Sequence, residues 1–424
     1  MVSLLARLKT LDGELDEGGF TPTRVEERRQ IMDDLRKLEA VDAMDTTQKA
    51  KIKWAVEGDG NSGFFHAAFF DYFGNKFLPF NGVRVHTRSD RFAQLGWDDA
   101  NRLEAPFTDH QIKDAVWDCR SDRAPGPDGF TFRFLKKYCE VFSEDVKAFV
   151  YEFYNLGIIP NGCNSSFITL IPKVENPLLI KDYRSISLIG MKFKIIAKLI
   201  ANRLDKVVHR VVSVEQSAFV KGRQILDGPL MVNELVSWFK NKRKRLLVFK
   251  VDFEKAYDSI SWDYLDQVMK FMGFGVRWMR WIRATLASAR SSVLVNGSPT
   301  AEFQLHRGLR QGDPLSPFLV ILVMEGLHVA MEGAVAASFF HGVDSHIHGL
   351  HLSYLFYADD ALFVGEWDTQ NIQNLIGVLK CFYLVSGLRI NLQKSNLFGV
   401  GVDAAEVGVL ADFTGCSATS FPFL

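Results

Sequence analysis

The sequence predicts an α+β fold, in which helices and strands follow one another without a regular strand–helix–strand repeat. Of its 424 residues, 47% are hydrophobic and 24% are charged. A chain of this length is expected to form two or three subdomains around buried cores, and this composition excludes a mostly disordered protein. Short apolar runs rich in β-branched and aromatic residues stand at irregular intervals between longer runs with helical spacing. A doubly wound parallel sheet would require regular intervals, so the pattern favours the α+β class.

The first half of the chain predicts helices on either side of a rigid loop. Residues 24–54 favour a charged helix, whereas residues 56–108 are interrupted by glycines and permit no assignment. Residues 124–129 contain two prolines and two glycines, which is typical of a rigid loop. Helical spacing returns over residues 132–154, and residues 192–212 predict a basic amphipathic helix.

The second half of the chain carries the clearest strand signals. Residues 246–251 are almost continuously apolar and predict a buried strand that ends at Asp252. Ser261 then offers an N-cap for a helix, and the Asn-Gly pair at residues 296–297 predicts a hairpin turn. Further strands are expected at residues 167–172 and 397–402, the latter followed by a polar tail.

The local charge is more informative than the total charge. Fifty Lys and Arg balance fifty Asp and Glu over the whole chain. Residues 173–223, however, hold eleven basic and four acidic residues, and the basic run at residues 240–250 contains no acid. A track for a phosphate backbone would need such a basic segment, although lysines that merely solvate helix faces would look the same.

The cysteines and the apolar runs predict the compartment. Five cysteines without a CxxC pair argue against a disulfide scaffold and favour a reducing, intracellular environment. We find no apolar run that approaches the roughly 20 residues of a membrane helix, since Glu325 interrupts the best stretch at residues 314–331. A soluble protein without a membrane partner is therefore expected.

Three carboxylates stand where strands are expected to end. Asp252 follows the strand at residues 246–251, and Asp359 with Asp360 separates two aromatic runs that predict a hairpin. Adjacent acids repel each other unless a cation neutralises them. If all three converge, they suit Mg²⁺, and two such ions roughly 3.5–4 Å apart can activate a hydroxyl and stabilise a leaving pyrophosphate. A strand-end cap for Asp252 and a solvated turn for the pair remain the alternatives.

A glycine-containing basic loop lies between these acids, at residues 307–317. Asp313 as N-cap and Pro314 as the first helical residue predict the start of an apolar helix. The two glycines of the loop would allow its backbone to approach a ligand, with Arg310 and Gln311 facing it.

These segments stand in the order of a known family. They are APGPDGF (124–130), LIPK (170–173), DYRSISL (182–188), QSAFVKGR (216–223), Asp252 with Tyr257, RQGDPLSP (310–317), FYADD (356–360) and GLRINLQKS (387–395). The chain resembles the reverse transcriptases of plant LINE-type (non-LTR) retrotransposons over about residues 110–400. The resemblance implies RNA-directed DNA synthesis by a right-hand polymerase fold, with fingers and an antiparallel palm sheet backed by helices. It implies fingers at residues 110–245 and a palm at residues 246–402, after an N-terminal region at 1–109 and before a truncated thumb region at 403–424, so that the thumb is missing.

The resemblance also implies roles for the acids and their neighbours. Asp252 and Asp359 match the metal-binding carboxylates, with Asp360 as the third acid, for two Mg²⁺ ions or Mn²⁺ in their place. Tyr257 matches the aromatic gate that excludes a ribose 2′-hydroxyl. Lys394 resembles the palm lysine that protonates the leaving pyrophosphate.

Further residues match positions that bind the substrates, which would be an RNA template, a DNA primer and dNTPs. Lys173 and Arg184 match the fingers residues that hold the triphosphate, a task suited to a point charge and a planar fork. Gln311 and Gly312 match the residues at the nucleotide's sugar and base. The candidate template contacts are Lys221 and Arg223. Nuclear residence follows from the family's habit of priming on chromosomal DNA.

One departure from the family pattern keeps other functions open. Ser185 stands where the family usually has proline, which frees a backbone N–H and would loosen the segment that carries Arg184. A decayed remnant that only binds nucleic acid is therefore the main alternative, and an RNA-templated RNA polymerase is a second one. A zinc site is a third, on the histidines at positions 341, 346, 348 and 351.

Overall fold

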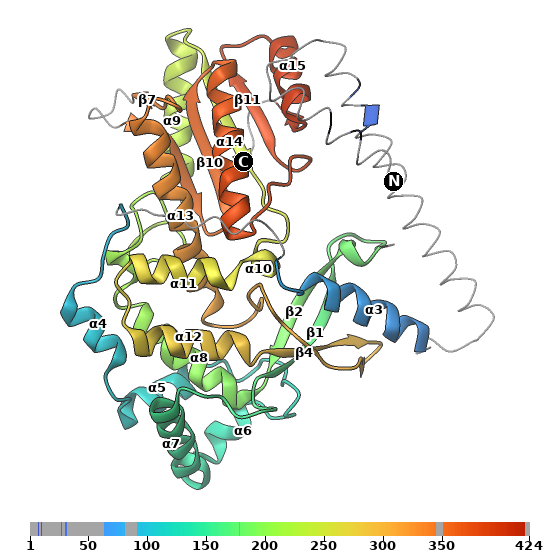
Figure 1. Ribbon diagram of the computed structural model, residues 1–424, viewed down its shortest axis with the longest axis vertical. Coiled ribbons are helices and arrows are strands. Elements are labelled where there is room, and N and C mark those ends of the chain that lie inside the picture. Colours follow the sequence, from blue (N-terminus) through green and yellow to red (C-terminus); the bar gives the residue numbers. More distant parts are fainter. Residues whose placement is uncertain are drawn as a thin grey trace.

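The computed structural model describes residues 63–80, 91–177, 179–344 and 351–419, together with Arg7, Thr10, Glu27, Gln30 and Ile31. The helix expected over residues 24–54 therefore lies outside the described residues, apart from three helical positions. Two five-stranded sheets, one above the other in Figure 1, are surrounded by helices. The mixture of helices and largely antiparallel sheets agrees with the predicted α+β class.

The lower sheet is built from strands of two distant parts of the sequence. Strand β1 (Ser165–Pro172) pairs antiparallel with β2 (Tyr183–Ile189) and parallel with β4 (Arg290–Val295). Strand β4 also pairs with β5 (Ser298–Pro299) and β6 (Phe303–Gln304). The hairpin predicted at Asn296 and Gly297 joins β4 to β5, and both turn residues have a positive φ.

The upper sheet has the buried strand β3 (Leu246–Val251) at its centre. Strand β10 (Asp360–Glu366) pairs antiparallel with one side of β3, and β11 (Asn396–Val400) with the other. Strand β9 (Tyr354–Tyr357) completes the predicted hairpin with β10. The sheet is antiparallel except at its edge, where β12 (Ser417–Ala418) runs parallel to β11.

From residue 63 onward, the described α-helices fill the space around the sheets. They are α3 (Gly63–Lys76), α4 (Trp97–Glu104), α5 (Asp109–Asp118), α6 (Phe132–Lys137), α7 (Cys139–Leu156), α8 (Met191–Leu204), α9 (Asp227–Asn241), α10 (Ala256–Ser259), α11 (Trp262–Phe271), α12 (Val276–Ala287), α13 (Ser316–Ala336), α14 (Thr369–Ser386) and α15 (Ala404–Thr414). Apolar residues of α9 pack on one face of the upper sheet, while α13 and α14 share the large core on its other face (Figure 1). Alternate residues of β3 therefore enter two different cores, as strand geometry requires.

Helix α13 has a length and composition that the sequence analysis underestimated. Within the described residues it is long and apolar enough to cross a membrane by those two criteria alone, contrary to our prediction that no run approaches this length. However, 67% of its most apolar window is buried inside the protein, where it packs against α11 and α14. Its apolar length is thus accounted for by the core.

Several predicted element limits are corrected by the structure. Residues 56–108, left unassigned, contain α3 and α4. The helix predicted over residues 192–212 ends at Leu204, and most of its residues are buried rather than solvated. The polar tail expected after residue 402 forms α15 instead.

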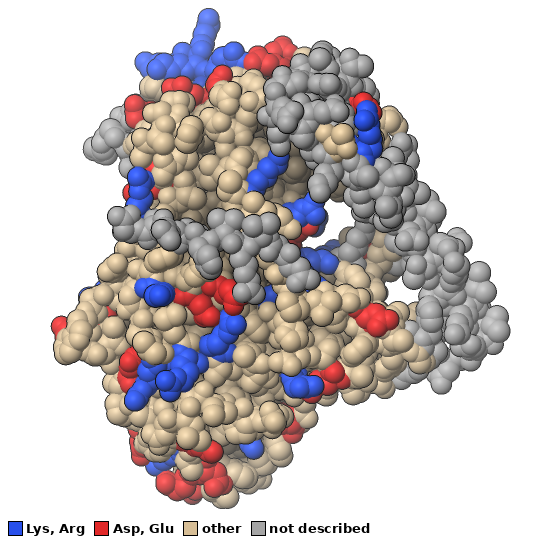
Figure 2. All heavy atoms as spheres, in the orientation of Figure 1, with Lys and Arg blue, Asp and Glu red and all other residues tan. Residues whose placement is uncertain are grey.

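The lower sheet contains strands from both sides of the predicted boundary between fingers and palm, which lies between residues 245 and 246. Strand β4, from the predicted palm range, joins β1 and β2 of the predicted fingers range. A single hydrophobic core also runs through both ranges. Residues 240–245, which include five Lys and Arg, precede β3 at the end opposite to Asp252, and Figure 2 shows Lys and Arg side chains gathered at the top of the molecule.

Candidate active site

The structure brings the three predicted acids together at one end of the upper sheet. Asp252 directly follows β3, and Asp360 opens the neighbouring antiparallel strand β10. Val251 and Ala361 are paired across these strands, so Asp252 and Asp360 stand one position beyond the same pair. Asp359 occupies the turn before β10, and both other carboxylates contribute to raising its pKa. Adjacent strands lie roughly 5 Å apart, so Asp252 and Asp360 stand close together, although no group of three His, Cys, Asp or Glu side chains in the described part of the chain is arranged to hold a metal ion.

Burial gives Asp252 and Asp359 an unfavourable environment for negative charge. Desolvation is the main cause that raises the pKa of both Asp252 and Asp359 above the usual range, and the repulsion among the acids adds to it. Positive charge on Lys394, Lys250 and Lys173 partly offsets this increase for Asp252. A bound cation would offset it further, because it favours the ionised carboxylates.

The segment at residues 387–395 holds Asp252 in place. The backbone N–H of Asn391 donates to the carbonyl oxygen of Asp252 at 2.7 Å, and the Asp252 N–H donates to Ser395 Oγ at 3.2 Å. A further backbone bond of 2.8 Å joins Glu254 to Arg389. The predicted residue Lys394 is thereby carried to the side of Asp252.

Cations gather beside the acids. Burial and four nearby cations, in the order Lys394, Lys255, Arg184 and Lys76, lower the pKa of Lys173 below its usual value. Lys173 follows β1 and Arg184 lies on the paired strand β2, so these two predicted residues are neighbours. Such a group of cations is complementary to an anion with several charges, such as a triphosphate.

Two of these cations, Lys76 and Lys255, were missed by the sequence analysis. Lys76, at the end of α3, forms an ion pair with Asp258, and Lys255 donates to Tyr72 Oη at 2.6 Å. These contacts fasten α3 to the short segment that carries Tyr257. Lys76 was missed because α3 lies in the stretch that permitted no assignment, and no sequence motif marks Lys255.

Tyr257 lies beside the acids, on the four-residue helix α10. Burial, and to a smaller extent the charge of Asp359, raise the pKa of its phenol to about 12, so the phenol stays protonated at neutral pH. The Leu309 N–H donates to the Tyr257 carbonyl at 2.5 Å, and the Gly308 N–H donates to the Ile260 carbonyl at 2.8 Å. The loop at residues 307–317 therefore supports α10 directly.

The comparisons with known proteins decide the family. Residues 171–423, more than half of the chain, match the family described as reverse transcriptase (RNA-dependent DNA polymerase). The chain belongs to the reverse transcriptase family. This match includes all the predicted site residues and implies a polymerase fold with fingers and palm.

Relatives of the reverse transcriptase place it among the non-LTR retrotransposon enzymes. It is 29% identical over 295 residues to the Transposon TX1 uncharacterized 149 kDa protein of Xenopus laevis, covering 70% of this chain and 22% of that protein. It is 26% identical over 309 residues to a Pol polyprotein from the type-1 retrotransposable element R2 of Popillia japonica, covering 71% and 39%. It is 32% identical over 108 residues to the uncharacterized mitochondrial protein AtMg01250 of Arabidopsis thaliana, covering 26% and 88%. The chain spans less than half the length of the first two relatives.

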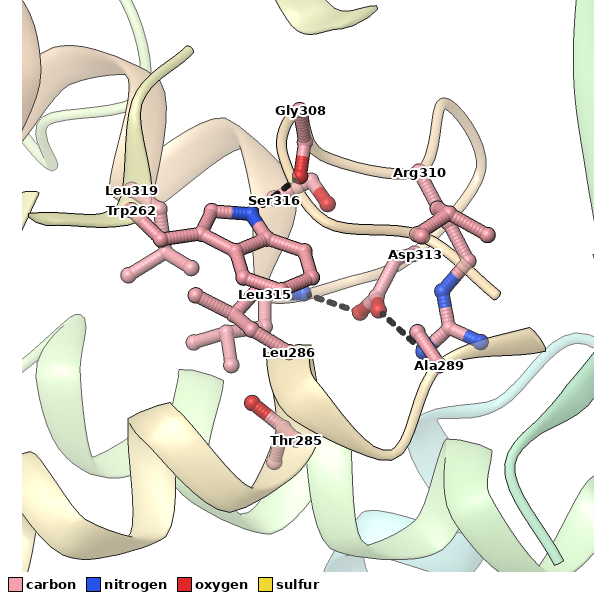
Figure 3. Close-up of a pocket in the computed structure, with 11 residues that line it drawn as sticks. Trp262, Thr285, Leu286, Ala289, Gly308, Arg310, Asp313, Leu315, Ser316 and Leu319 are labelled. Atoms are coloured by element: carbon pink, nitrogen blue, oxygen red, sulfur yellow. Dashed lines mark hydrogen bonds and ion pairs between the residues drawn. The ribbon is translucent and has the colours of Figure 1, made fainter. Parts of the chain in front are cut away.

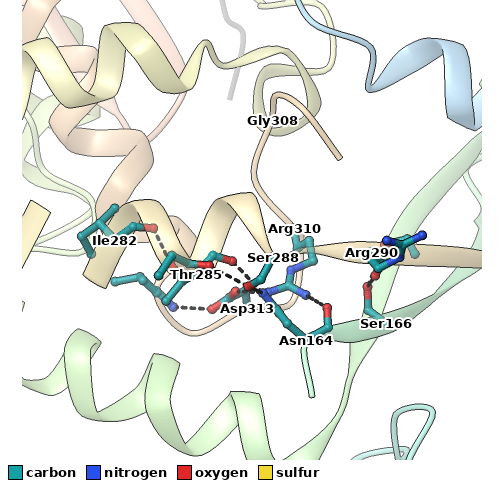
Figure 4. Close-up of polar contacts among 12 residues, drawn as sticks. Asn164, Ser166, Ile282, Thr285, Ser288, Arg290, Gly308, Arg310 and Asp313 are labelled. Atoms are coloured by element: carbon teal, nitrogen blue, oxygen red, sulfur yellow. Dashed lines mark hydrogen bonds and ion pairs between the residues drawn. The ribbon is translucent and has the colours of Figure 1, made fainter. Parts of the chain in front are cut away.

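The loop of the reverse transcriptase before α13 differs from its prediction. Arg310 does not face a ligand: it is buried, its guanidinium lies 4.2 Å from the Phe193 ring centroid, and it donates to the Asn164 carbonyl at 3.2 Å. It also pairs with Asp313 at 3.4 Å (Figures 3 and 4). Asp313 uses its other oxygen to accept from the Leu315 N–H at 2.9 Å. Helix α13 accordingly begins at Ser316, three residues after the predicted cap.

Both glycines of this loop approach protein backbone rather than a ligand. A Cβ on Gly308 would lie 2.5 Å from the carbonyl oxygen of Asp258, and one on Gly312 would lie 2.9 Å from that of Ser187. The Ser187 N–H donates to the Gln311 carbonyl at 2.8 Å. Gln311 and Gly312 thus lie against β2 of the lower sheet, and the Gln311 side chain is half-buried.

The segment QSAFVKGR lies along β9, next to the acids. The Arg223 guanidinium donates to the carbonyls of Ser213, Val212 (3.0 Å) and Gln216 (2.5 Å). These bonds favour a role for Arg223 in holding its own loop over the predicted template contact. Lys221 is exposed, as a template contact requires.

The structure does not support two further predictions, a loosened segment at Ser185 and a zinc site. Ser185 is not in a loose loop: it lies within β2 and is paired with Leu170. The zinc alternative receives no support among the described residues, where no cluster of three potential metal ligands of this kind occurs. His346 and His348 lie outside the described residues.

Proposed function

We propose that this reverse transcriptase is the polymerase part of a plant LINE-type retrotransposon and copies RNA into DNA. In this reaction the primer 3′-hydroxyl attacks the α-phosphorus of a dNTP, a new P–O bond forms, and the bond to the leaving pyrophosphate breaks. The observation that carries the proposal is the meeting of three carboxylates with a group of cations at one edge of the upper sheet. A plant relative supports the plant assignment.

The donor set fits Mg²⁺, or Mn²⁺ in its place. The described residues contain no preformed cage of three potential ligands, but Mg²⁺ keeps several waters and binds through one or two carboxylates plus substrate phosphates. Asp252 and Asp359 would hold two such ions, with Asp360 as the third acid. When bound, the ions would supply an activated primer hydroxyl and neutralise charge on the pyrophosphate.

The cations would bind and orient the nucleotide. Lys173 and Arg184 would hold the triphosphate, and the positive charges of Lys394, Lys255 and Lys76 near Lys173 would add to the attraction. Lys394, which lies near Asp252, would give a proton to the leaving pyrophosphate. Gln311 with Gly312 would contact the sugar and base.

Two contacts would select the substrates. The Tyr257 ring beside Asp359 would collide with a ribose 2′-hydroxyl and so favour dNTPs. Lys221 would contact the RNA template. Nuclear location, which priming on chromosomal DNA would require, remains a prediction.

Extension of a DNA primer on an RNA template tests the proposal. Activity should require Mg²⁺ or Mn²⁺ and should fall by more than about a hundredfold in Asp359→Asn, which removes one metal-binding charge. Asp412→Asn, an exposed acid on α15, is the matched control and should leave activity unchanged. If Asp359→Asn extends primers normally, the assignment of the acids is wrong. Steeply salt-dependent nucleic-acid binding without any extension would instead favour the binding-only remnant.

A further inference from the structure

Gln216 is a fully buried amide that contacts the turn carrying Asp359. Its Oε1 accepts from the Ala358 N–H at 2.8 Å and from the Ala218 N–H at 3.0 Å. Its Nε2 donates to the Ala358 carbonyl at 3.1 Å. One side chain, with 0% of its surface exposed, therefore binds both backbone groups of the residue directly before Asp359.

The backbone of Ala358 needs such support. Its φ of 54° lies in the left-handed region, which is unfavourable for a residue with a Cβ. Ala358 and Asp359 form the turn between β9 and β10, where glycine is the usual residue for a positive φ. The conformation of Ala358 sets the direction in which the chain presents Asp359. Nothing in the local sequence favours that conformation.

The segment that carries Gln216 is held firmly against the hairpin. The Phe356 N–H donates to the Glu215 carbonyl at 2.9 Å, and the Ser217 N–H donates to the Phe356 carbonyl at 3.0 Å. On its other side, Arg223 donates to the Gln216 carbonyl at 2.5 Å. These hydrogen bonds fix the backbone around Gln216, so its side chain is not carried by a loose loop.

We propose that Gln216 is a positioning residue. It fixes Ala358 in its left-handed conformation and so directs the Asp359 carboxylate toward the metal ions of the proposed active site. The inference rests on the proposed function, because it gives Asp359 a metal-binding task. It predicts that loss of the Gln216 amide weakens cation binding without loss of any metal ligand. Supports of this kind typically change metal affinity or activity by about 10- to 100-fold.

Asn371 provides a matched control for a purely structural role. It is buried and also binds both backbone groups of one residue: its Oδ1 accepts from the His341 N–H at 2.8 Å, and its Nδ2 donates to the His341 carbonyl at 2.9 Å. Its Nδ2 also donates to the carbonyl of Glu366, at the end of β10 opposite to Asp360. Replacing Asn371 with leucine removes comparable bonds far from the acids.

The experiment measures Mn²⁺ binding by electron paramagnetic resonance in the full chain, with thermal unfolding as the check on folding. Gln216→Met should weaken Mn²⁺ binding by about tenfold or more, whereas Asn371→Leu should lower the melting temperature and bind Mn²⁺ as the wild type does. Equal binding by Gln216→Met and wild type overturns the inference. So does an equal loss in Gln216→Met and Asn371→Leu, because that would reflect general destabilisation.

Gln216→Glu serves if the methionine variant does not fold. An ionised glutamate cannot donate to the Ala358 carbonyl, but a protonated one can. At a pH at which this glutamate is ionised, the variant should therefore bind Mn²⁺ more weakly than wild type, and the two affinities should converge as the pH is lowered. A ratio of one across the whole pH range would overturn the inference.

Asp359→Asn separates this inference from the proposed function. If wild type and Asp359→Asn bind Mn²⁺ equally, the metal site itself is wrong and the proposed function fails with it. If Asp359→Asn loses binding and Gln216→Met does not, only the role of Gln216 is overturned.

Discussion

Glu325 makes the stability of this reverse transcriptase depend on pH, and Glu325→Gln tests that dependence. The residue lies on the apolar helix α13 with 3% of its surface exposed. Its two carboxylate oxygens accept from the Ser213 N–H and the Ser213 hydroxyl, both at 3.0 Å. Burial nevertheless raises its pKa from 4.5 to about 7, with the two Ser213 bonds and Arg223 opposing the increase and Glu215 adding to it.

The size and sign of the effect follow from proton linkage. Between pH 4.5 and about 7 the folded protein holds a proton on Glu325 that the unfolded chain has lost. The free energy of unfolding must therefore decrease as pH rises through this range, because the folded state binds more protons there. The stabilisation that comes from holding the proton on Glu325 is fully present below pH 4.5 and is lost above about pH 7. Since one pKa unit corresponds to about 1.4 kcal/mol, the whole change is about 3 kcal/mol.

A glutamine at position 325 has nearly the same size as glutamate and keeps one oxygen that can accept from Ser213, but it does not titrate. Relative to wild type, Glu325→Gln should therefore gain up to about 3 kcal/mol of unfolding free energy between pH 5 and pH 8. Urea unfolding of both proteins at several pH values measures this difference. Glu152→Gln, an exposed glutamate on α7, is the control and should show no such trend. A difference that stays constant with pH would refute the reasoning, because Glu325 would then be equally ionised in both states.

The remaining predictions concern the gate, the buried ion pair and the core. Tyr257→Ala should incorporate ribonucleotides more readily relative to dNTPs in primer extension, and unchanged discrimination would contradict the gate. Arg310→Met should lose about 3–5 kcal/mol in denaturant unfolding, because Asp313 would be left buried without its partner, and the double variant Arg310→Met/Asp313→Leu should lose less. Trp281→Ala should cost about 3–5 kcal/mol, since its ring is fully buried. Trp97→Ala, with 80% of its surface exposed, should change stability by less than about 0.5 kcal/mol, and equal losses would contradict the packing argument.

Features with a local physical cause could be predicted from the sequence. The strand β3 was predicted because an apolar run of strand length can be buried on both faces. The β9–β10 hairpin was predicted because two aromatic runs flank two acids. The N-cap at Ser261 was also predicted, and its hydroxyl accepts from the Tyr264 N–H in the structure. In each case neighbours along the chain determine the conformation.

Features that depend on distant partners could not be predicted in this way. Gly308 was expected to approach a ligand, but it approaches the Asp258 carbonyl, and a glycine is needed equally in either case. Arg310 was expected to face the substrate, yet an aromatic ring and a carboxylate from the core surround it. The hydrogen bonds of Gln216 to Ala358 also escaped prediction, because a buried glutamine gives no periodic signal and Ala358 lies 142 positions away.

The charges of the site suggest why its two ligands should bind together. Burial disfavours the ionised forms of Asp252 and Asp359 and also the charged form of Lys173. A divalent cation would reverse the first penalty and a triphosphate the second, while the cation and the phosphates attract each other. Either ligand alone would leave the carboxylates or the lysine and arginine cluster without an opposite charge. Cation and nucleotide should therefore strengthen each other's binding, and by linkage the strengthening must be equal in both directions.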